Sequence, residues 1–192
     1  DQKKGGSRMK NLFQLLGGIR NPQQFLQSMM NNSQVMGNPM AKNAIDMIKE
    51  NFDFIIIDSS PALGMITINI MTASDSVLIP IQCEYYALEG LSQLIYTINL
   101  AKKKLNKNLE LEGVVFTMYD SRTNLSLQVV ENVKDNLKQN IYKTIIPRNI
   151  RLAEAPSYGQ PINIYDTRST GAESYRLLAQ EVMERDKEIK EK

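Results

Sequence analysis

The most informative segment of the chain reads Phe52-Asp-Phe-Ile-Ile-Ile-Asp58-Ser-Ser-Pro61. Residues 54–57 form a continuous apolar run without polar alternation, which is typical of a strand buried on both faces of a parallel sheet. Asp58 follows where the carboxyl end of that strand is expected, and open α/β sheets bind their ligands at those ends. An aspartate after a strand is also a common turn or helix N-cap residue. The segment therefore predicts a buried strand and leaves a functional and a structural role open for Asp58.

Strand and helix patterns alternate downstream of residue 52. We expect strands at residues 54–57, 76–81, 113–118 and 143–146, and helices at residues 62–73, 87–104, 125–138 and 171–188. Apolar strands that alternate with helices of this length predict right-handed βαβ crossovers. The predicted fold class is therefore α/β, with a mainly parallel sheet of about four strands and helices on both sides.

The first fifty residues differ in composition from the rest of the chain. They hold six of the ten methionines and carry a net charge of +4, whereas residues 51–192 carry −2. Asn21-Pro22 and Asn38-Pro39 each combine an N-cap residue with proline at the first helical position. We expect residues 1–8 to be a flexible leader, residues 9–50 a Met- and Asn-rich helical segment of unrelated character, and residues 51–192 the α/β domain.

The overall composition excludes several classes of function. The 192 residues include no histidine and one cysteine, Cys83, which rules out histidine triads, histidine metal sites and an internal disulfide. Cys83 is expected to be a buried small apolar residue and not a nucleophile. The net charge of +2 indicates no global attraction to nucleic acid. No apolar run of about 18 residues and no signal-peptide pattern occur, so we expect a cytoplasmic protein without a membrane partner.

Together with its downstream neighbours, the first segment resembles the ParA/Soj chromosome- and plasmid-partitioning ATPases, which are relatives of the septum-positioning ATPase MinD. The resemblance covers about two thirds of the chain, residues 52–182. Besides the opening segment, it rests on Leu63-Gly64, Ile79-Pro80-Ile-Gln-Cys-Glu-Tyr-Tyr-Ala-Leu-Glu-Gly90-Leu-Ser, Thr117-Met-Tyr-Asp-Ser-Arg-Thr-Asn124, Ile146-Pro-Arg-Asn149 and Arg151-Leu-Ala-Glu-Ala-Pro156-Ser-Tyr-Gly159. It implies a doubly wound sheet of the P-loop NTPase kind.

The resemblance also implies the site. Asp58 would be the Walker B carboxylate that orients Mg²⁺ through water, and Pro61 and Gly64 would belong to the switch segment after it. Pro147, Arg148 and Asn149 would form the loop that packs on and reads the adenine of ATP; a helix start with a misplaced proline is the alternative for these three residues. Family members sandwich ATP in a homodimer, bind DNA without sequence specificity and are stimulated by a ParB-like partner.

One family element is absent from the sequence. The phosphate loop needs a Gly-rich turn ending in Gly-Lys-[Ser/Thr], but Lys4-Gly5-Gly6 is followed by Ser7, Arg8, Met9 and Lys10, and no Gly-Lys pair occurs anywhere. We therefore expect the first strand and the phosphate loop to be missing, and ATP hydrolysis to be deficient. Three hypotheses remain open: a partitioning protein, a non-enzymatic binding or interaction module, and a composite gene product without independent activity. Whether the chain is itself an enzyme stays open.

Four basic residues are the candidates for contacts with DNA phosphates. They are Lys134, Lys138, Lys143 and Arg168. Ile164 stands where several relatives have arginine, so this surface is less basic than in those proteins. Lysines on exposed helices are often only solubilising, which is the alternative for this set.

Overall fold

The structure is a computed structural model that describes residues 39–59, 64–137 and 140–190. The expected leader, the helix opened by Asn21-Pro22, and the residues Pro61 and Lys138 lie outside these ranges. The chain divides into two compact units, one made of residues 1–75 and 96–109 and the other of residues 76–95 and 110–192.

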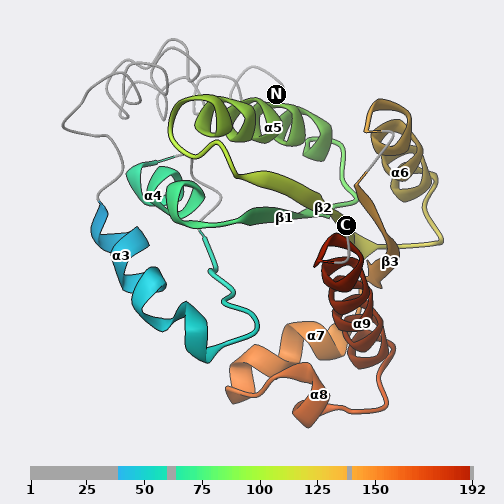
Figure 1. Cartoon of the computed structure of the whole chain (residues 1–192). Helices are drawn as coiled ribbons and strands as arrows, with labels where there is room; N and C mark the ends of the chain where they lie inside the picture. The colour runs from blue at the N-terminus through green and yellow to red at the C-terminus, as the bar shows by residue number, and fades with distance from the viewer. Residues whose placement is uncertain (1–38, 60–63, 138–139, 191–192) are drawn as a thin grey trace, which may run out of the picture. The chain divides into compact units, whose positions relative to one another are not determined.

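The second unit contains a sheet of three parallel strands, β1 (Ser76–Gln82), β2 (Glu110–Tyr119) and β3 (Ile141–Pro147), in the order β1-β2-β3. Figure 1 shows this sheet with β2 in the middle. The strands predicted at residues 76–81, 113–118 and 143–146 are confirmed. Parallel strands joined through helices also confirm the α/β fold class.

The helices of the described residues agree with the predicted pattern. The helix predicted at residues 87–104 has those bounds, the one at 125–138 begins and ends slightly earlier, and Pro39 starts a helix as its N-cap signature indicated. In chain order the helices are α3 (Pro39–Ile48), η1 (Lys49–Asn51), α4 (Met65–Ala73), α5 (Ala87–Lys104), α6 (Asn124–Asn136), α7 (Ile150–Glu154), η2 (Ala155–Tyr158), α8 (Ile162–Tyr165) and α9 (Thr170–Lys190).

The core of the second unit lies between the sheet and α9, which runs beside β3 in Figure 1. Val115, Tyr142 and Ile146 are buried there, and Leu178 and Val182 of α9 pack against them. Cys83, directly after β1, is also buried, as predicted from the sequence. Burial raises the pKa of the Cys83 thiol to about 11, so the nucleophilic thiolate is scarce at neutral pH.

Strand β3 is irregular, and a carboxylate of α9 satisfies its backbone. Between Ile141 and Ile145 it contains more residues than β2 does over the paired segment. Glu181 accepts hydrogen bonds from the backbone N–H groups of Lys143 and Thr144 at 2.8 and 2.9 Å. Burial raises the pKa of Glu181, but these hydrogen bonds outweigh it and hold the pKa below its usual value. An ionised Glu181 thus joins α9 to the irregular part of β3.

The first unit is helical in its described part. Ile68 and Met71 of α4 are buried, and the side-chain amide of Asn106 donates to the carbonyl oxygens of Met71 and Ser74 at 3.1 and 2.7 Å. These bonds fasten the end of α4 to the segment after α5. None of the helices that the structure describes is long and apolar enough to cross a membrane.

The strand predicted at residues 54–57 is wrong, and the sheet has three strands in place of about four. Residues 54–59 belong to no helix or strand, and the side chains of Phe54 and Ile56 are 45% and 93% exposed. An apolar run becomes a buried strand only where a neighbouring strand supplies hydrogen-bond partners. This segment belongs to the unit whose described residues include no strand, which is the physical reason for the difference.

Candidate functional site

The candidate site of the second unit lies at the carboxyl ends of β2 and β3, which share one edge of the parallel sheet. Strand β2 ends at Tyr119 and β3 ends at Pro147, and these two residues are paired. Arg148, the next residue, donates its backbone N–H to the carbonyl oxygen of Tyr119 at 2.9 Å. The loop 147–149 is therefore anchored to the central strand.

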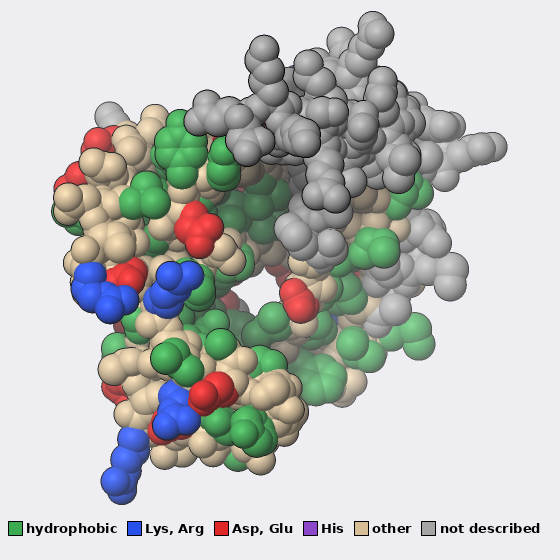
Figure 2. Space-filling view, turned by 180° about the vertical axis from the view of Figure 1, so that it is seen from behind, with side chains coloured by type: hydrophobic (Ala, Val, Ile, Leu, Met, Phe, Trp, Pro, Cys, Tyr) green, Lys and Arg blue, Asp and Glu red, His purple; other side chains and the backbone are tan. Residues whose placement is uncertain are grey.

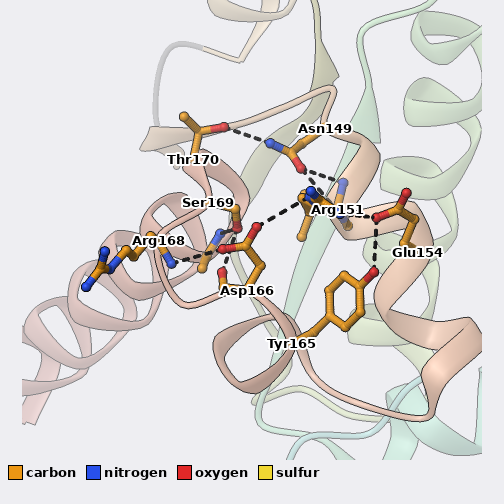
Figure 3. A network of polar contacts seen from close by, with 10 residues as sticks. Asn149, Arg151, Glu154, Tyr165, Asp166, Arg168, Ser169 and Thr170 are labelled. Carbon is orange, nitrogen blue, oxygen red and sulfur yellow. Dashed lines mark hydrogen bonds and ion pairs between the residues drawn. The ribbon is translucent and has the colours of Figure 1, made fainter.

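Asn149 is the residue at which this loop meets two helices. Its side-chain oxygen caps α7 by accepting hydrogen bonds from the backbone N–H groups of Arg151 at 2.8 Å and Leu152 at 3.4 Å. Its amide nitrogen donates to Oγ1 of Thr170, the first residue of α9, at 2.8 Å (Figure 3). Asn149 is the N-cap of α7, which begins at Ile150, and Pro147 is the last residue of β3, so no proline lies within that helix.

The hydrogen bonds of the Asn149 side chain determine which of its donor and acceptor groups remain available to a ligand. An asparagine amide has two N–H donors and one acceptor oxygen. The oxygen already serves two backbone groups, and one N–H serves Thr170. One N–H remains for a ligand, so this side chain offers an adenine edge one donor and no acceptor.

A polar network continues from Asn149 towards α8 and the start of α9 (Figure 3). The guanidinium group of Arg151 contacts the carboxylates of Glu154 at 2.9 Å and Asp166 at 3.4 Å. Tyr165 donates its hydroxyl to Glu154 at 3.1 Å, and burial together with this bond raises the pKa of Tyr165. The ring of Tyr158 stacks on that of Tyr165 with centroids 5.1 Å apart. These contacts fold residues 149–170 into one connected structure.

Asp120, directly after β2, is held as an anion. Arg122 donates from Nε and a terminal nitrogen to its two carboxylate oxygens at 2.9 and 2.7 Å. These hydrogen bonds, with one from the Arg122 backbone and the nearby charge of Arg148, lower the pKa of Asp120 to about 2. Asp120 is therefore a permanent charge that orients arginines and not a proton donor at neutral pH.

The residues predicted to bind magnesium and to form the switch belong to the other unit. Asp58 is exposed and follows residues 54–57, which belong to no helix or strand. Gly64 is the N-cap residue of α4, with its carbonyl oxygen accepting from the N–H of Ile68 at 3.1 Å, and Pro61 lies outside the described residues. Asp58 and the loop 147–149 thus lie in separate units.

The donor groups of the described residues decide whether Mg²⁺ fits this chain. Among the residues that the structure describes, no group of three or more Asp, Glu, Cys or His side chains could hold a metal ion. Asp58 is an exposed carboxylate that belongs to no such group. These residues do not by themselves make a magnesium site, and no reaction step can be assigned to a metal held by them.

The candidate DNA-binding residues lie on different elements. Lys134 is in the last turn of α6, Lys143 is on β3, and Arg168 is in the turn before α9; all three are exposed, and Lys138 lies outside the described residues. The Arg168 side chain points away from the network in Figure 3, while its backbone N–H donates to Asp166 at 3.2 Å. On the coloured surface of Figure 2, basic side chains lie close to acidic ones and form no continuous basic patch.

Two arginines at this edge of the sheet were not among the residues predicted to act at a site. Arg122 follows β2, and Arg151 follows β3 beside Arg148 of the predicted adenine loop; the side chains of Arg122 and Arg151 are 84% and 54% exposed. The argument that singled out Asp58 at a strand end applies equally to these positions. A search for charged residues directly after each predicted strand would therefore have found them.

Comparison with known proteins places the chain in a class. A family model described as an AAA domain matches residues 13–111, more than half of the chain. Among solved structures, cobyrinic acid a,c-diamide synthase from Mycobacterium smegmatis with bound ATP analog and magnesium is 32% identical with a TM-score of 0.62, over 80% of this chain and 56% of that chain. The fold and the family match define an AAA-domain α/β protein with the P-loop NTPase architecture.

Two curated relatives narrow this class. The sporulation initiation inhibitor protein Soj of Bacillus subtilis is 60% identical over 141 residues, which are 73% of this chain and 56% of that protein. The chromosome partitioning protein ParA of Myxococcus xanthus is 52% identical over 145 residues, 76% of this chain and 51% of that protein. The chain therefore belongs to the ParA/Soj family, and it spans about half the length of these curated relatives.

The family match includes most of the N-terminal segment 9–50. The AAA-domain match begins at residue 13, inside the segment 9–50. The unrelated character of that segment, and a domain boundary near residue 50, stay predictions.

Proposed function

We propose that the chain acts in ParA/Soj-type partitioning of chromosomes or plasmids, as the part of such a protein that binds the adenine of ATP and contacts DNA. The observation that carries this proposal is the loop Pro147–Asn149, anchored to β2 by the Arg148 N–H and to α9 by the Asn149 amide. A ligand loop at the carboxyl edge of a parallel sheet, held on both sides, is suited to bind a planar base between fixed groups.

In this proposal Pro147 gives the adenine a rigid apolar edge, and the remaining N–H of Asn149 donates to it. The described residues do not by themselves make a magnesium site, so no metal-assisted step is proposed. The sequence offers no Gly-Lys pair to cradle the phosphates of ATP. We therefore propose that this chain alone binds adenine nucleotide weakly and does not hydrolyse ATP.

DNA binding is proposed for the basic residues of the second unit. Lys134, Lys138, Lys143 and Arg168 would neutralise phosphates without reading bases, and the exposed arginines Arg122, Arg148 and Arg151 extend the set. By analogy with the family, the working assembly is a homodimer in the cytoplasm, associated with the nucleoid when it binds DNA and stimulated by a ParB-like partner. This partner assignment rests on the family alone.

The test combines hydrolysis with DNA binding. A steady-state assay with Mg²⁺-ATP should give no turnover above background; turnover comparable to that of intact family members contradicts the deficiency. Binding to a duplex of arbitrary sequence should weaken steeply with salt, and Lys138→Glu with Arg168→Glu should reduce both the affinity and the salt slope, by roughly one unit for each lost phosphate contact. Lys103→Glu with Lys107→Glu is the matched control, because it reverses the same charge on exposed residues elsewhere. Equal effects of the two double variants would remove Lys138 and Arg168 from the DNA surface.

A second candidate function is a non-enzymatic binding module. The exposure of Asp58, after residues that belong to no helix or strand, favours it, because a metal-orienting carboxylate needs a fixed position. Binding of DNA that is unchanged by adenine nucleotide, with no nucleotide bound to the chain, would select this function over the first.

A further inference from the structure

The backbone of Met118, near the end of β2, has a conformation that L-amino acids other than glycine rarely adopt. Its φ is 53°, in the left-handed region. A strained residue of this kind persists only where the surrounding structure requires it. Among the non-glycine residues that the structure describes, Met118 and Asn140 have a positive φ, and asparagine tolerates it better than methionine. The conformation of Met118 therefore needs a structural reason.

The pairing of β2 with β3 contains an extra residue at this point. Phe116 pairs with Ile145 and Tyr119 pairs with Pro147, so β2 advances from 116 to 119 while β3 advances only from 145 to 147. This is the pattern of a β-bulge, in which one residue of the longer side has no partner and the strand bends. Bulges are common beside ligand sites because they change the direction of the groups that follow.

The bulge changes the side of β2 to which the carbonyl group of Tyr119 points. In a regular parallel strand, the peptide groups of successive residues face the two neighbouring strands alternately. The carbonyl oxygen of Thr117 faces β1, because it accepts the N–H of Cys83, directly after β1, at 3.0 Å. Unbroken alternation would turn Tyr119, two residues later, towards β1 as well. Its carbonyl oxygen instead accepts the N–H of Arg148, directly after β3, at 2.9 Å.

We propose that the left-handed backbone of Met118 places the loop Pro147–Asn149. It turns the carbonyl group of Tyr119 from β1 to the N–H of Arg148, and this hydrogen bond holds the loop where it binds the nucleotide. The inference rests on the proposed function and adds a residue that determines the geometry of its site. Met118 is a positioning residue in this mechanism, because its backbone conformation is required and its side chain is not.

The residue type at position 118 should therefore control the loop through its backbone preference. Glycine adopts the left-handed region freely and asparagine tolerates it, whereas a β-branched residue in this region is an outlier. An ordinary L-residue adopts it roughly 5- to 30-fold less readily than the right-handed region. Met118→Val should open the hydrogen bond between Arg148 and Tyr119. Met118→Gly and Met118→Asn should keep it, although neither side chain resembles that of methionine.

The first measurement is hydrogen exchange of the Arg148 amide, followed by NMR in the full chain and its variants at position 118. The internal control is the amide of Val114, which donates to the carbonyl oxygen of Asn140 at 2.8 Å, at the other end of the β2–β3 pair. A general loss of stability accelerates exchange at both amides, whereas a displaced loop accelerates it at Arg148 alone. Met118→Val should lower the protection of Arg148 relative to Val114 roughly 5- to 30-fold. Met118→Gly and Met118→Asn should equal or exceed the wild-type ratio.

The second measurement is the dissociation constant of fluorescently labelled ADP for the same variants, with thermal unfolding to confirm that each is folded. Met118→Val should raise this constant by the same factor of roughly 5 to 30, and Met118→Gly and Met118→Asn should keep the wild-type value. Loss of binding in Met118→Gly and Met118→Asn, with Arg148 protected as in wild type, would mean that the methionine side chain acts on the ligand. That result overturns the inference.

The two measurements separate the inference from the proposed function. If the Arg148 amide is equally protected in all folded variants, Met118 does not place the loop, and the proposed function is unaffected. If the folded wild-type chain binds no ADP, the proposed function fails, and the exchange series still supports or refutes the placement of the loop. If Met118→Val does not fold, Met118→Asn and Met118→Leu replace it: protection of Arg148 in Met118→Asn supports the inference, and protection in Met118→Leu alone refutes it.

Discussion

Gly113→Ala should destabilise the second unit strongly, because the structure leaves no room for one methyl group. Gly113 is buried in β2, and a Cβ atom there would lie 2.7 Å from Cε2 of Tyr142 and 3.0 Å from the carbonyl oxygen of Asn140. The tyrosine ring is not free to move away. Its hydroxyl donates to Glu112 at 2.7 Å, and the guanidinium group of Arg185 stacks over the ring 3.9 Å from its centroid.

The expected magnitude combines three contributions. Overpacking costs about 1–3 kcal/mol. Displacing the ring weakens a hydrogen bond to a charged carboxylate, a bond of about 1.5–3 kcal/mol. The lower backbone entropy of the unfolded alanine chain returns about 0.4–1 kcal/mol. The free energy of unfolding should therefore fall by about 2–4 kcal/mol.

The assay is urea unfolding followed by circular dichroism, with Gly90→Ala as the matched control. Gly90 lies in α5, and apart from its chain neighbours and the backbone of that helix no atom lies within 4 Å of the position that an alanine methyl group would take, so this substitution should stabilise by about 0.5–1 kcal/mol. In a double-mutant cycle, Tyr142→Phe should recover part of the Gly113→Ala cost, because the ring then loses its bond to Glu112. A Gly113→Ala chain as stable as wild type would refute the reasoning, and a cycle without coupling would show that Tyr142 is not the obstacle.

Four shorter predictions test other parts of the structure. Gly171→Ala should cost about 1–3 kcal/mol in urea unfolding, because the added methyl group meets Leu152; no loss would mean that α7 and α9 are not packed at this point. Hydrogen bonds lower the pKa of Glu181 below its ordinary value of 4.5 in spite of burial, so its contribution to stability is present above that pH and is lost as the pH falls through the lower pKa of the folded state. Glu181→Gln should accordingly destabilise the chain more at neutral pH than in acid, and a constant difference across this window would contradict the assignment. Carbon-detected NMR titration should give Asp120 a pKa of about 2, and Arg122→Met should raise it; an unchanged pKa would mean that Arg122 is not its main partner. Ile56→Asp should change stability by less than about 0.5 kcal/mol, as expected at an exposed position, whereas Ile79→Asp at the 4% exposed Ile79 should be severely destabilising; a severe loss for Ile56→Asp would restore the predicted buried strand.

The predictable part of the fold is the part in which each apolar run has a neighbour in the same unit. The runs at residues 76–81, 113–118 and 143–146 became β1, β2 and β3, which pair with one another. The helix at residues 87–104 was predicted with its observed bounds, since its apolar face and its terminal lysines mark where it lies and ends. In these segments the local sequence pattern favours the same structure that the neighbouring strands and helices stabilise. Such agreement allows the structure to be predicted from the sequence.

The candidate site was predictable in position and not in detail. The resemblance located the loop Pro147–Asn149, and the structure places it at the end of β3. Nothing in the sequence links Asn149 to Thr170, because the contact depends on how two helix starts approach each other in space. The basic residues show the same limit: an exposed lysine on a helix and an arginine at a strand end carry equal charge in a sequence, and only the fold distinguishes their surroundings.

Residues 54–57 do not form the predicted buried strand, and this affects the position of Asp58. The run Phe54-Ile-Ile-Ile57 specifies an apolar segment, but burial on both faces requires strands beside it and helices over it. With Ile56 93% exposed, those partners are not provided by the described residues. A strand that paired with this segment would bury Ile56, a gain of about 1.5–3 kcal/mol, and would at the same time fix Asp58 at a strand end. Burial of residues 54–57 and a fixed position of the Asp58 carboxylate therefore require the same thing, a strand paired with this segment. An activity that needs a fixed Asp58 needs that pairing as well.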